Sequence, residues 1–339
     1  MGLNQLMPNN SFAVLGLGLA ALGRPGYINL GHGQDLPADH DVQQMLAQAH
    51  AVLDCALELG IRYFDAARSY GRAEEFLATW LEHRGLVSAG DAGLTIASKW
   101  GYTYAADWQV QLPAGQPHEI KEHSLERLNV QYRESRLLLG ECLSLYQVHS
   151  ATLDSGILEN SDVLDRLAEL RDAGLRIGLS VSGPKQADVI RAAMNCLRGS
   201  SQVFSAVQAT WNLLETSAGD ALQEASDCGW TVIVKEGVAN GRLTDRNQMP
   251  DFESQKNQLQ DVADQCNASI DAVALAAILI QPWANVVLSG ASTTEQLRSN
   301  YRSLQVAETL LADQVLDLCS PLVETPADYW QQRSNLAWN

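Results

Sequence analysis

The stretch LSLYQVHSATLDSGILENSDVLDRLAELRDAGLRIGLSV, residues 143–181, holds one complete unit of the pattern that decides the fold. It opens with the apolar run Leu143–Val148 and closes with a second run, Leu175–Val181. Between them, Ser161–Ala173 is amphipathic and is followed by Gly174, a residue type that commonly ends helices. A buried strand, a helix and another buried strand in this order are typical of a parallel sheet.

The same alternation continues from one end of the chain to the other. Eight apolar runs have the length of buried strands: Phe12–Leu19, Ile61–Phe64, Leu94–Ala97, Leu143–Val148, Leu175–Val181, Val203–Ala209, Thr231–Val234 and Asn285–Leu288. The segments between them predict helices over Asp41–Leu59, Ala73–Leu81, Glu119–Leu139, Ser161–Ala173, Pro184–Leu197, Thr216–Cys228 and Thr294–Leu304, with two more in Asp251–Ile280. A last helix, Leu310–Val323, is expected before a tail.

Eight strand-then-helix units predict an α/β protein with a (β/α)8 TIM barrel. We expect a single domain over residues 1–339, with the extra C-terminal helix and tail added to the barrel. The alternative is an open doubly wound sheet with a second domain. The barrel is favoured because the alternation is not interrupted anywhere along the chain.

The composition narrows the class of partner. The chain has 23 Lys and Arg against 40 Asp and Glu, a net charge of −17, which repels nucleic acids and anionic lipid surfaces. The six cysteines form no C-x-x-C pair, so we expect buried, reduced thiols, no metal and no disulfide framework. No secretory signal or membrane span is expected, and the predicted location is the cytoplasm.

In a barrel of this type, chemistry takes place at the carboxyl ends of the strands. Asp65 directly follows one apolar run, and Tyr70 lies five residues further on. Lys99 and His149 follow the next two runs in the same way. Each residue alone has an ordinary explanation: a turn former, a loop aromatic, a surface lysine and a core histidine. Together at one end of one barrel, they predict an active site.

The four side chains suit proton transfer to a carbonyl oxygen. A tyrosine hydroxyl has an ordinary pKa of about 10, and a neighbouring ammonium is expected to lower it. Asp65 would keep Lys99 charged and in place, and His149 would orient the carbonyl oxygen or share the proton. Since no side chain supplies a hydride, the hydride must come from a cofactor.

This set of residues, with the text around it, resembles the aldo-keto reductase superfamily over residues 12–305. The resemblance lies in Phe64-Asp65-Ala66-Ala67 with Tyr70-Gly71, in Ala97-Ser98-Lys99 and in Gln147-Val148-His149. It implies an NAD(P)(H)-dependent oxidoreductase that interconverts an aldehyde or ketone and the alcohol. Tyr70 would be the proton donor, assisted by Asp65, Lys99 and His149. The region Gly178–Gln186 and the loop that contains Lys235 and Glu236 resemble a bacterial branch of the family that acts on sugars, the aldose dehydrogenases.

The resemblance also implies a cofactor site. Ser180 and Gln208 would hold the nicotinamide carboxamide, and Trp211 would stack on the ring. The implied contacts with the rest of the nucleotide come from Gly18, Gly241, Arg242, Leu243, Gly290, Gln296 and Asn300. NADP is the family default. NAD is the alternative, because Gly290 and Ser292 stand where members place Lys or Arg against the 2′-phosphate.

The sequence says less about which residues bind the substrate. Tyr27 and Trp100 belong to aromatic loops that suit a sugar or an aromatic carbonyl, and suit loop packing equally well. Two other functions stay open at this point. One is a cofactor-binding regulatory barrel with little turnover. The other is an aldolase that uses Lys99 as a Schiff base.

Overall fold

The computed structural model describes residues 13–88, 90–309 and 321–339. Its central feature is a closed barrel of eight parallel strands in the order β1-β12-β11-β10-β7-β6-β3-β2. The strands are β1 (Val14–Gly18), β2 (Tyr63–Asp65), β3 (Thr95–Trp100), β6 (Leu143–Ala151), β7 (Arg176–Val181), β10 (Ala206–Thr210), β11 (Thr231–Lys235) and β12 (Val286–Ser289). Each falls on one of the eight predicted runs. The barrel prediction is confirmed, and the open sheet is excluded because β1 pairs with β12, Val14 opposite Val286.

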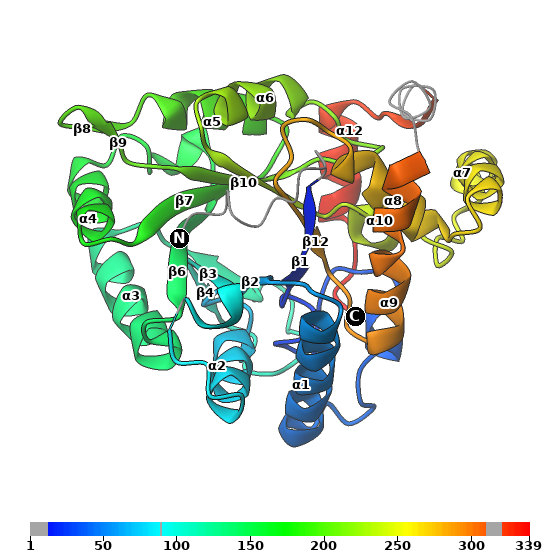
Figure 1. The fold of residues 1–339 in the computed structure, drawn as a ribbon, viewed down its shortest axis with the longest axis horizontal. Coiled ribbons are helices and arrows are strands. Elements are labelled where there is room, and N and C mark those ends of the chain that lie inside the picture. Colours follow the sequence, from blue (N-terminus) through cyan, green and yellow to red (C-terminus); the bar gives the residue numbers. More distant parts are fainter. Residues whose placement is uncertain (1–12, 89, 310–320) are drawn as a thin grey trace.

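The helices form an outer ring around the strands, with α7 outermost on one side (Figure 1). They are α1 (Val42–Glu58), α2 (Ala73–His83), α3 (Leu125–Leu139), α4 (Ser161–Asp172), α5 (Gln186–Met194), α6 (Gly219–Asp227), α7 (Glu253–Gln265), α8 (Ile270–Leu279), α9 (Thr294–Tyr301), α10 (Ser303–Thr309) and α12 (Pro326–Ser334). Their starts follow ordinary capping chemistry. Asp41 Oδ1, for example, accepts hydrogen bonds from the backbone N–H groups of Gln43 and Gln44, both 3.0 Å long.

Two apolar clusters hold the barrel together. The smaller one joins buried side chains of six strands and is made of Tyr63, Ala97, Leu145, Ala206, Ile233, Val286 and Leu288. The larger one contains the apolar faces of the helices, such as Val52 and Leu53 of α1. This layering explains why the strand runs are apolar on both faces and the helices only on one.

The structure departs from the sequence prediction in the segment after β3. The expected helix Glu119–Leu139 begins only at Leu125, where Ser124 Oγ accepts a 3.1 Å hydrogen bond from the N–H of Arg127. The residues before it form an antiparallel hairpin of β4 (Tyr102–Tyr104) and β5 (Glu119–Lys121). A second small hairpin pairs β8 (Leu197–Arg198) with β9 (Ser201–Gln202). Strands of two or three residues are too short to show a periodic pattern in the sequence. Their pairing depends on how the loop between them closes.

The C-terminal region also differs from expectation. The helix predicted over Thr294–Leu304 is two helices, α9 and α10, and most of the one predicted over Leu310–Val323 lies outside the described residues. The expected tail contains α12, which Thr325 caps through a 3.2 Å bond from the N–H of Asp328. The last residue, Asn339, exchanges two 3.2 Å backbone hydrogen bonds with Tyr27 in the loop after β1. The tail is therefore packed onto the carboxyl end of the barrel.

The structure also bears on the expectations about the cysteines and about membrane-spanning helices. Cys228 is exposed, so the expectation of buried thiols is wrong for that residue. Among the described helices, none is by itself long and apolar enough to cross a membrane. One pair, Pro250–Gln265 with Ile270–Leu279, passes that test only jointly and is bent by 80°.

The loops after β1 and β2 are locked together at Gly23. A Cβ atom at this position would lie 2.2 Å from the carbonyl oxygen of Tyr70 and 2.5 Å from Cβ of Ala73. The carbonyl oxygen of Gly23 accepts a 2.7 Å hydrogen bond from the N–H of Arg72. The position of the Tyr70 loop thus depends on a residue without a side chain in the loop after β1.

We expect Gly23→Ala to lower the free energy of unfolding by about 1–3 kcal/mol, because the added methyl group overlaps backbone atoms. Urea unfolding followed by circular dichroism measures the effect. Gly26→Ala in the same loop is the control, since its nearest contact would be an ordinary 3.4 Å. Equal unfolding midpoints for the two variants would show that the two loops are not locked in this way.

Candidate active site

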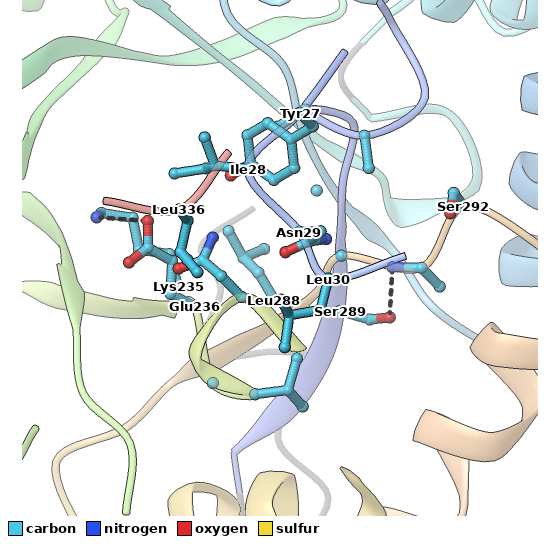
Figure 2. Close-up of a pocket in the computed structure, with 18 of the residues that line it drawn as sticks. Tyr27, Ile28, Asn29, Leu30, Lys235, Glu236, Leu288, Ser289, Ser292 and Leu336 are labelled. Carbon is cyan, nitrogen blue, oxygen red and sulfur yellow. Dashed lines mark hydrogen bonds and ion pairs between the residues drawn. The ribbon is translucent and has the colours of Figure 1, made fainter. Parts of the chain in front are cut away.

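A cavity of about 580 Å³ opens at the carboxyl end of the barrel. Its walls come from the loop after β1, the ends of β2, β6, β10, β11 and β12, the helix α9 and the C-terminal tail. Figure 2 shows Tyr27 and Asn29 of the first loop, Lys235 and Glu236 at the end of β11, and Ser289 of β12 around one space. The volume lies in the range of cofactor and small-molecule sites.

Asp65 and Lys99 form a buried ion pair beneath the cavity. The Lys99 side chain is 0% exposed and that of Asp65 2%. The Lys99 ammonium donates to Oδ2 of Asp65 and, over 3.0 Å, to the carbonyl oxygen of Ala66. Oδ1 of Asp65 accepts from Nε2 of Gln208 at 2.9 Å and of Gln147 at 3.2 Å. Side chains from three other strands therefore converge on the Asp65 carboxylate of β2, and these contacts fix the position of the lysine.

Tyr70 and His149 lie over this pair and line the cavity. The Lys99 Nζ is 4.8 Å from the centroid of the Tyr70 ring. The Tyr70 and His149 rings meet edge to face with centroids 5.4 Å apart. The structure brings together all four residues of the predicted catalytic set.

The proton states of these two rings follow from burial. Burial, and next the charge of Asp65, raise the pKa of Tyr70 well above 10. The lowered pKa expected from the sequence is therefore wrong for the protein without ligand, and Tyr70 keeps its proton. Burial and then the charges of Lys99 and Lys235 hold the pKa of His149 well below its ordinary value. His149 is thus a neutral imidazole, able to donate from one nitrogen.

Arg24 is part of the site, although no motif in the sequence points to it. Its side chain is 2% exposed and donates to the carbonyl oxygen of Ser69 at 2.9 Å and to Oε1 of Glu119 at 2.7 Å. The guanidinium carbon lies 5.2 Å from the Tyr70 ring centroid and 4.9 Å from that of Trp338. These contacts come from residues 45 to more than 300 positions away, so no local motif reveals them.

A second charged cluster stands at the end of β11. Lys235 and Glu236 are neighbours in the chain, and Nζ of Lys235 lies 3.8 Å from Oε1 of Glu236. The stronger partner of Glu236 is Arg333 of α12, whose Nε lies 3.0 and 2.9 Å from the two carboxylate oxygens. Despite burial, Arg333 and Lys235 hold the pKa of Glu236 at about 2. Burial lowers the pKa of Lys235 to about 8.

Part of the predicted cofactor set lines the cavity. These residues are Gly18, Gln208, Gly290, Gln296 and Asn300. Asn300 Nδ2 donates to Ser289 Oγ over 2.8 Å. Ser180 lies behind the wall and is 1% exposed. Its Oγ accepts a 2.8 Å bond from the N–H of Ser150, which does line the cavity.

Three other residues of the predicted cofactor set do not line the cavity. Trp211 is a core residue that packs edge to face on Trp283, with ring centroids 5.6 Å apart. Leu243 is fully buried in the core, and the Arg242 guanidinium is bound to Glu324. None of these three lines the main cavity. They follow β10 and β11 where the chain turns back toward the helices.

Gly241 and Trp100 do not line the cavity either. A Cβ atom at Gly241 would meet Cβ of Leu30 at 3.0 Å, so this glycine permits contact between two loops rather than with the cavity. Trp100 is 0% exposed and packs against His123, whereas Tyr27 does line the cavity. Of the two predicted substrate residues, only Tyr27 is in position.

The cavity fits a dinucleotide by its shape and chemistry. Glycines line two of its walls, Gly18 and Gly290, where an added Cβ atom would meet nothing closer than 3.6 Å and a ligand can approach the backbone closely. The buried amide oxygen of Asn240, which belongs to the lining, has no hydrogen-bond partner among the described residues. An elongated polar ligand would satisfy such a group.

The Glu236 cluster makes stability depend on pH. A carboxyl whose pKa falls from 4.5 to about 2 on folding stabilises the protein fully above pH 4.5, and this contribution fades as the pH falls toward 2. We expect Glu236→Gln to lose about 3 kcal/mol of unfolding free energy at neutral pH, because it also leaves Arg333 unpartnered.

Urea unfolding at a series of pH values measures this difference, which should narrow as the pH falls below 4.5. Glu224→Gln is the matched control, since Glu224 forms an exposed pair with Arg191 and the exchange should leave the midpoint nearly unchanged. A gap between wild type and Glu236→Gln that stays constant with pH would contradict the assignment.

Comparisons with known proteins agree with this geometry. The model of the Aldo/keto reductase family matches residues 15–320. An uncharacterised oxidoreductase of Bacillus subtilis, YqkF, is 25% identical over 276 residues, which covers 76% of this chain and 82% of that protein. Aldo-keto reductase str7 of Strobilurus tenacellus is 25% identical over 325 residues, 86% and 83% of the two chains.

A solved structure shows the same fold. The holo form of aldo-keto reductase AKR11C1 from Bacillus halodurans superposes with a TM-score of 0.66 at 20% identity, over 92% of each chain. The barrel, the four residues gathered at its carboxyl end and the family match over most of the chain lead to one conclusion. This protein is an oxidoreductase of the aldo/keto reductase family.

Proposed function

We propose that the protein is an NAD(P)(H)-dependent oxidoreductase that interconverts a carbonyl compound and its alcohol, with Tyr70 as the proton donor. The observation that carries the proposal is the buried Asp65–Lys99 pair directly beside the Tyr70 ring. A buried ammonium 4.8 Å from a phenol ring stabilises the phenolate that forms when the proton leaves.

The proton transfer follows from the states of the side chains. Burial keeps Tyr70 protonated in the resting protein, which a general acid requires. When the carbonyl carbon accepts a hydride, its oxygen becomes more basic and takes the proton from Tyr70 Oη. Neutral His149 donates a hydrogen bond to the same oxygen. Asp65 holds Lys99 in place throughout.

A nicotinamide cofactor supplies the hydride when bound. Gln208 at the catalytic end and Gly18, Gly290, Gln296 and Asn300 further along the cavity are the residues we propose to hold it. The match of the chain to a family that uses nicotinamide cofactors supports this.

We propose a polyhydroxylated carbonyl, such as a sugar, as substrate. Two ion pairs, Arg24–Glu119 and Arg333–Glu236, line the cavity near Tyr70. Hydroxyl groups can donate to the carboxylates and accept from the guanidinium groups. Trp338 adds an apolar wall. The balanced charges favour a neutral polar substrate, and the acidic composition disfavours nucleic-acid partners.

The structure argues against the aldolase alternative. A Schiff-base lysine must reach the substrate as a free amine. Lys99 is 0% exposed, is bound to a carboxylate and does not line the cavity. A single domain over 1–339 and a cytoplasmic location stay predictions from the sequence.

Binding of cofactor is the first test. Titration of the intrinsic fluorescence with NADPH and with NADH should show saturable quenching by at least one of them, followed by turnover of small aldehydes or aldoses. Binding without turnover of any carbonyl would favour a regulatory, cofactor-binding barrel. No binding of either nucleotide would contradict the proposed function.

We expect Tyr70→Phe to lower kcat by at least about 100-fold, because it removes the proton donor. Cofactor affinity should remain nearly unchanged. Lys99→Met should also remove turnover. Tyr132→Phe is the control, since Tyr132 packs on Tyr146 and does not line the cavity. If Tyr70→Phe and Tyr132→Phe turned over equally fast, Tyr70 would have no part in the mechanism.

A further inference from the structure

The cavity has a second end, far from the catalytic residues. Its lining there comes from Leu30 and Asp35 after β1, from Thr244–Arg246 after β11, and from residues before and within α9: Gly290, Ala291, Ser292, Gln296, Ser299 and Asn300. Figure 2 shows Ser292 on the opposite side of the view from Lys235 and Glu236. A dinucleotide with its nicotinamide beside Tyr70 must place its adenosine in this second end.

Asp35 dominates the chemistry of that end. Its side chain is 10% exposed. Oδ2 accepts from Arg246 at 2.6 Å, Gln296 at 2.8 Å and Ser292 at 3.4 Å. Oδ1 accepts from Arg246 at 2.5 Å. Since a carboxylate oxygen has two acceptor positions, Oδ1 has room for one more donor beyond those that the described residues supply.

The remaining charges do not favour an anion. Asp245 and Asp271 also line this end, whereas Arg246 is its one cation among the described lining residues, and Asp35 already binds it. Gly290, Ser292 and Gln296 carry no charge. Arg298 of α9 is 59% exposed, and its guanidinium lies 3.9 Å from the carboxylate of Glu58. Neither Arg298 nor Arg302 lines the cavity.

We propose that Asp35 makes this protein select NAD(H) against NADP(H). Its free Oδ1 position accepts a hydrogen bond from the 2′-hydroxyl of the adenosine ribose, the group that a 2′-phosphate replaces in NADP(H). A 2′-phosphate would bring up to two negative charges beside a largely buried carboxylate whose cation is already engaged. The inference rests on the proposed function, since it concerns the same cofactor site.

The wild-type protein tests the inference without any reaction. Isothermal titration with NAD+ and NADP+, and with ADP-ribose and its 2′-phosphate, measures the preference directly. We expect the unphosphorylated member of each pair to bind at least about tenfold tighter. Tighter binding of the phosphorylated members would overturn the role of Asp35 and leave the proposed function intact. Failure of all four to bind would overturn the proposed function itself.

Three variants identify the residue responsible. Asp35→Asn keeps the shape of the side chain and should bring the two affinities within about threefold of each other, mainly by strengthening NADP+ binding. Asp39→Asn makes the same change of charge at an exposed position four residues away, outside the cavity, and should keep the wild-type preference. Thermal melting of the ligand-free variants checks that both are folded.

Arg246→Gln tests the competing explanation, in which Arg246 binds the 2′-phosphate of NADP+. If Arg246 released Asp35 to bind the phosphate, this variant would lose NADP+ affinity specifically, and the proposal would be overturned. Under the proposal it keeps the preference for NAD+, because the carboxylate remains. An unchanged preference in Asp35→Asn would equally overturn the assignment.

Discussion

The site depends on the burial of one ion pair, Lys99 with Asp65. A fully buried ammonium is costly to remove from water unless its partners are close and well oriented. Here a carboxylate and the carbonyl oxygen of Ala66 provide those partners, and two amides complete the shell of Asp65. The donors stand on β3, β6 and β10 and the acceptor on β2. The closed barrel therefore brings together all the partners of this ion pair.

The groups above this pair are tuned by burial rather than by the lysine alone. Tyr70 is held protonated and His149 neutral, because removing either ring from water disfavours its charged form. In the proposed mechanism, the lysine stabilises the charge that develops on the phenol oxygen during proton transfer, which the pKa of Tyr70 before the reaction does not report. This explains why an ammonium beside the ring coexists with a raised tyrosine pKa.

The rim of the cavity is built from parts of the chain that have no sequence relationship. Arg24 joins the Tyr70 loop to the β4–β5 hairpin, and Arg333 joins α12 to the end of β11. Asp35 and Arg246 join the first loop to the loop after β11. Each link is a charge pair with little exposure on at least one side. Although the chain is strongly acidic, Arg24, Arg246 and Arg333 all line the cavity, where each is paired with a carboxylate.

The apolar runs of the sequence predict both the barrel and the meeting of Asp65, Tyr70, Lys99 and His149 at its carboxyl end. Runs of apolar residues must be buried on both faces, so eight of them with intervening helices leave few other folds, and polar residues that directly follow such runs must meet at one end. The tertiary structure alone decided the rest. Arg24, Asp35 and Arg333 acquire their roles from partners that the loops and the tail bring close. Trp211, which follows β10, and Trp100, the last residue of β3, pack in the core and do not line the cavity. The physical reason is that burial patterns are local and repeat along the chain, whereas the pairing of side chains across loops depends on how the whole chain closes.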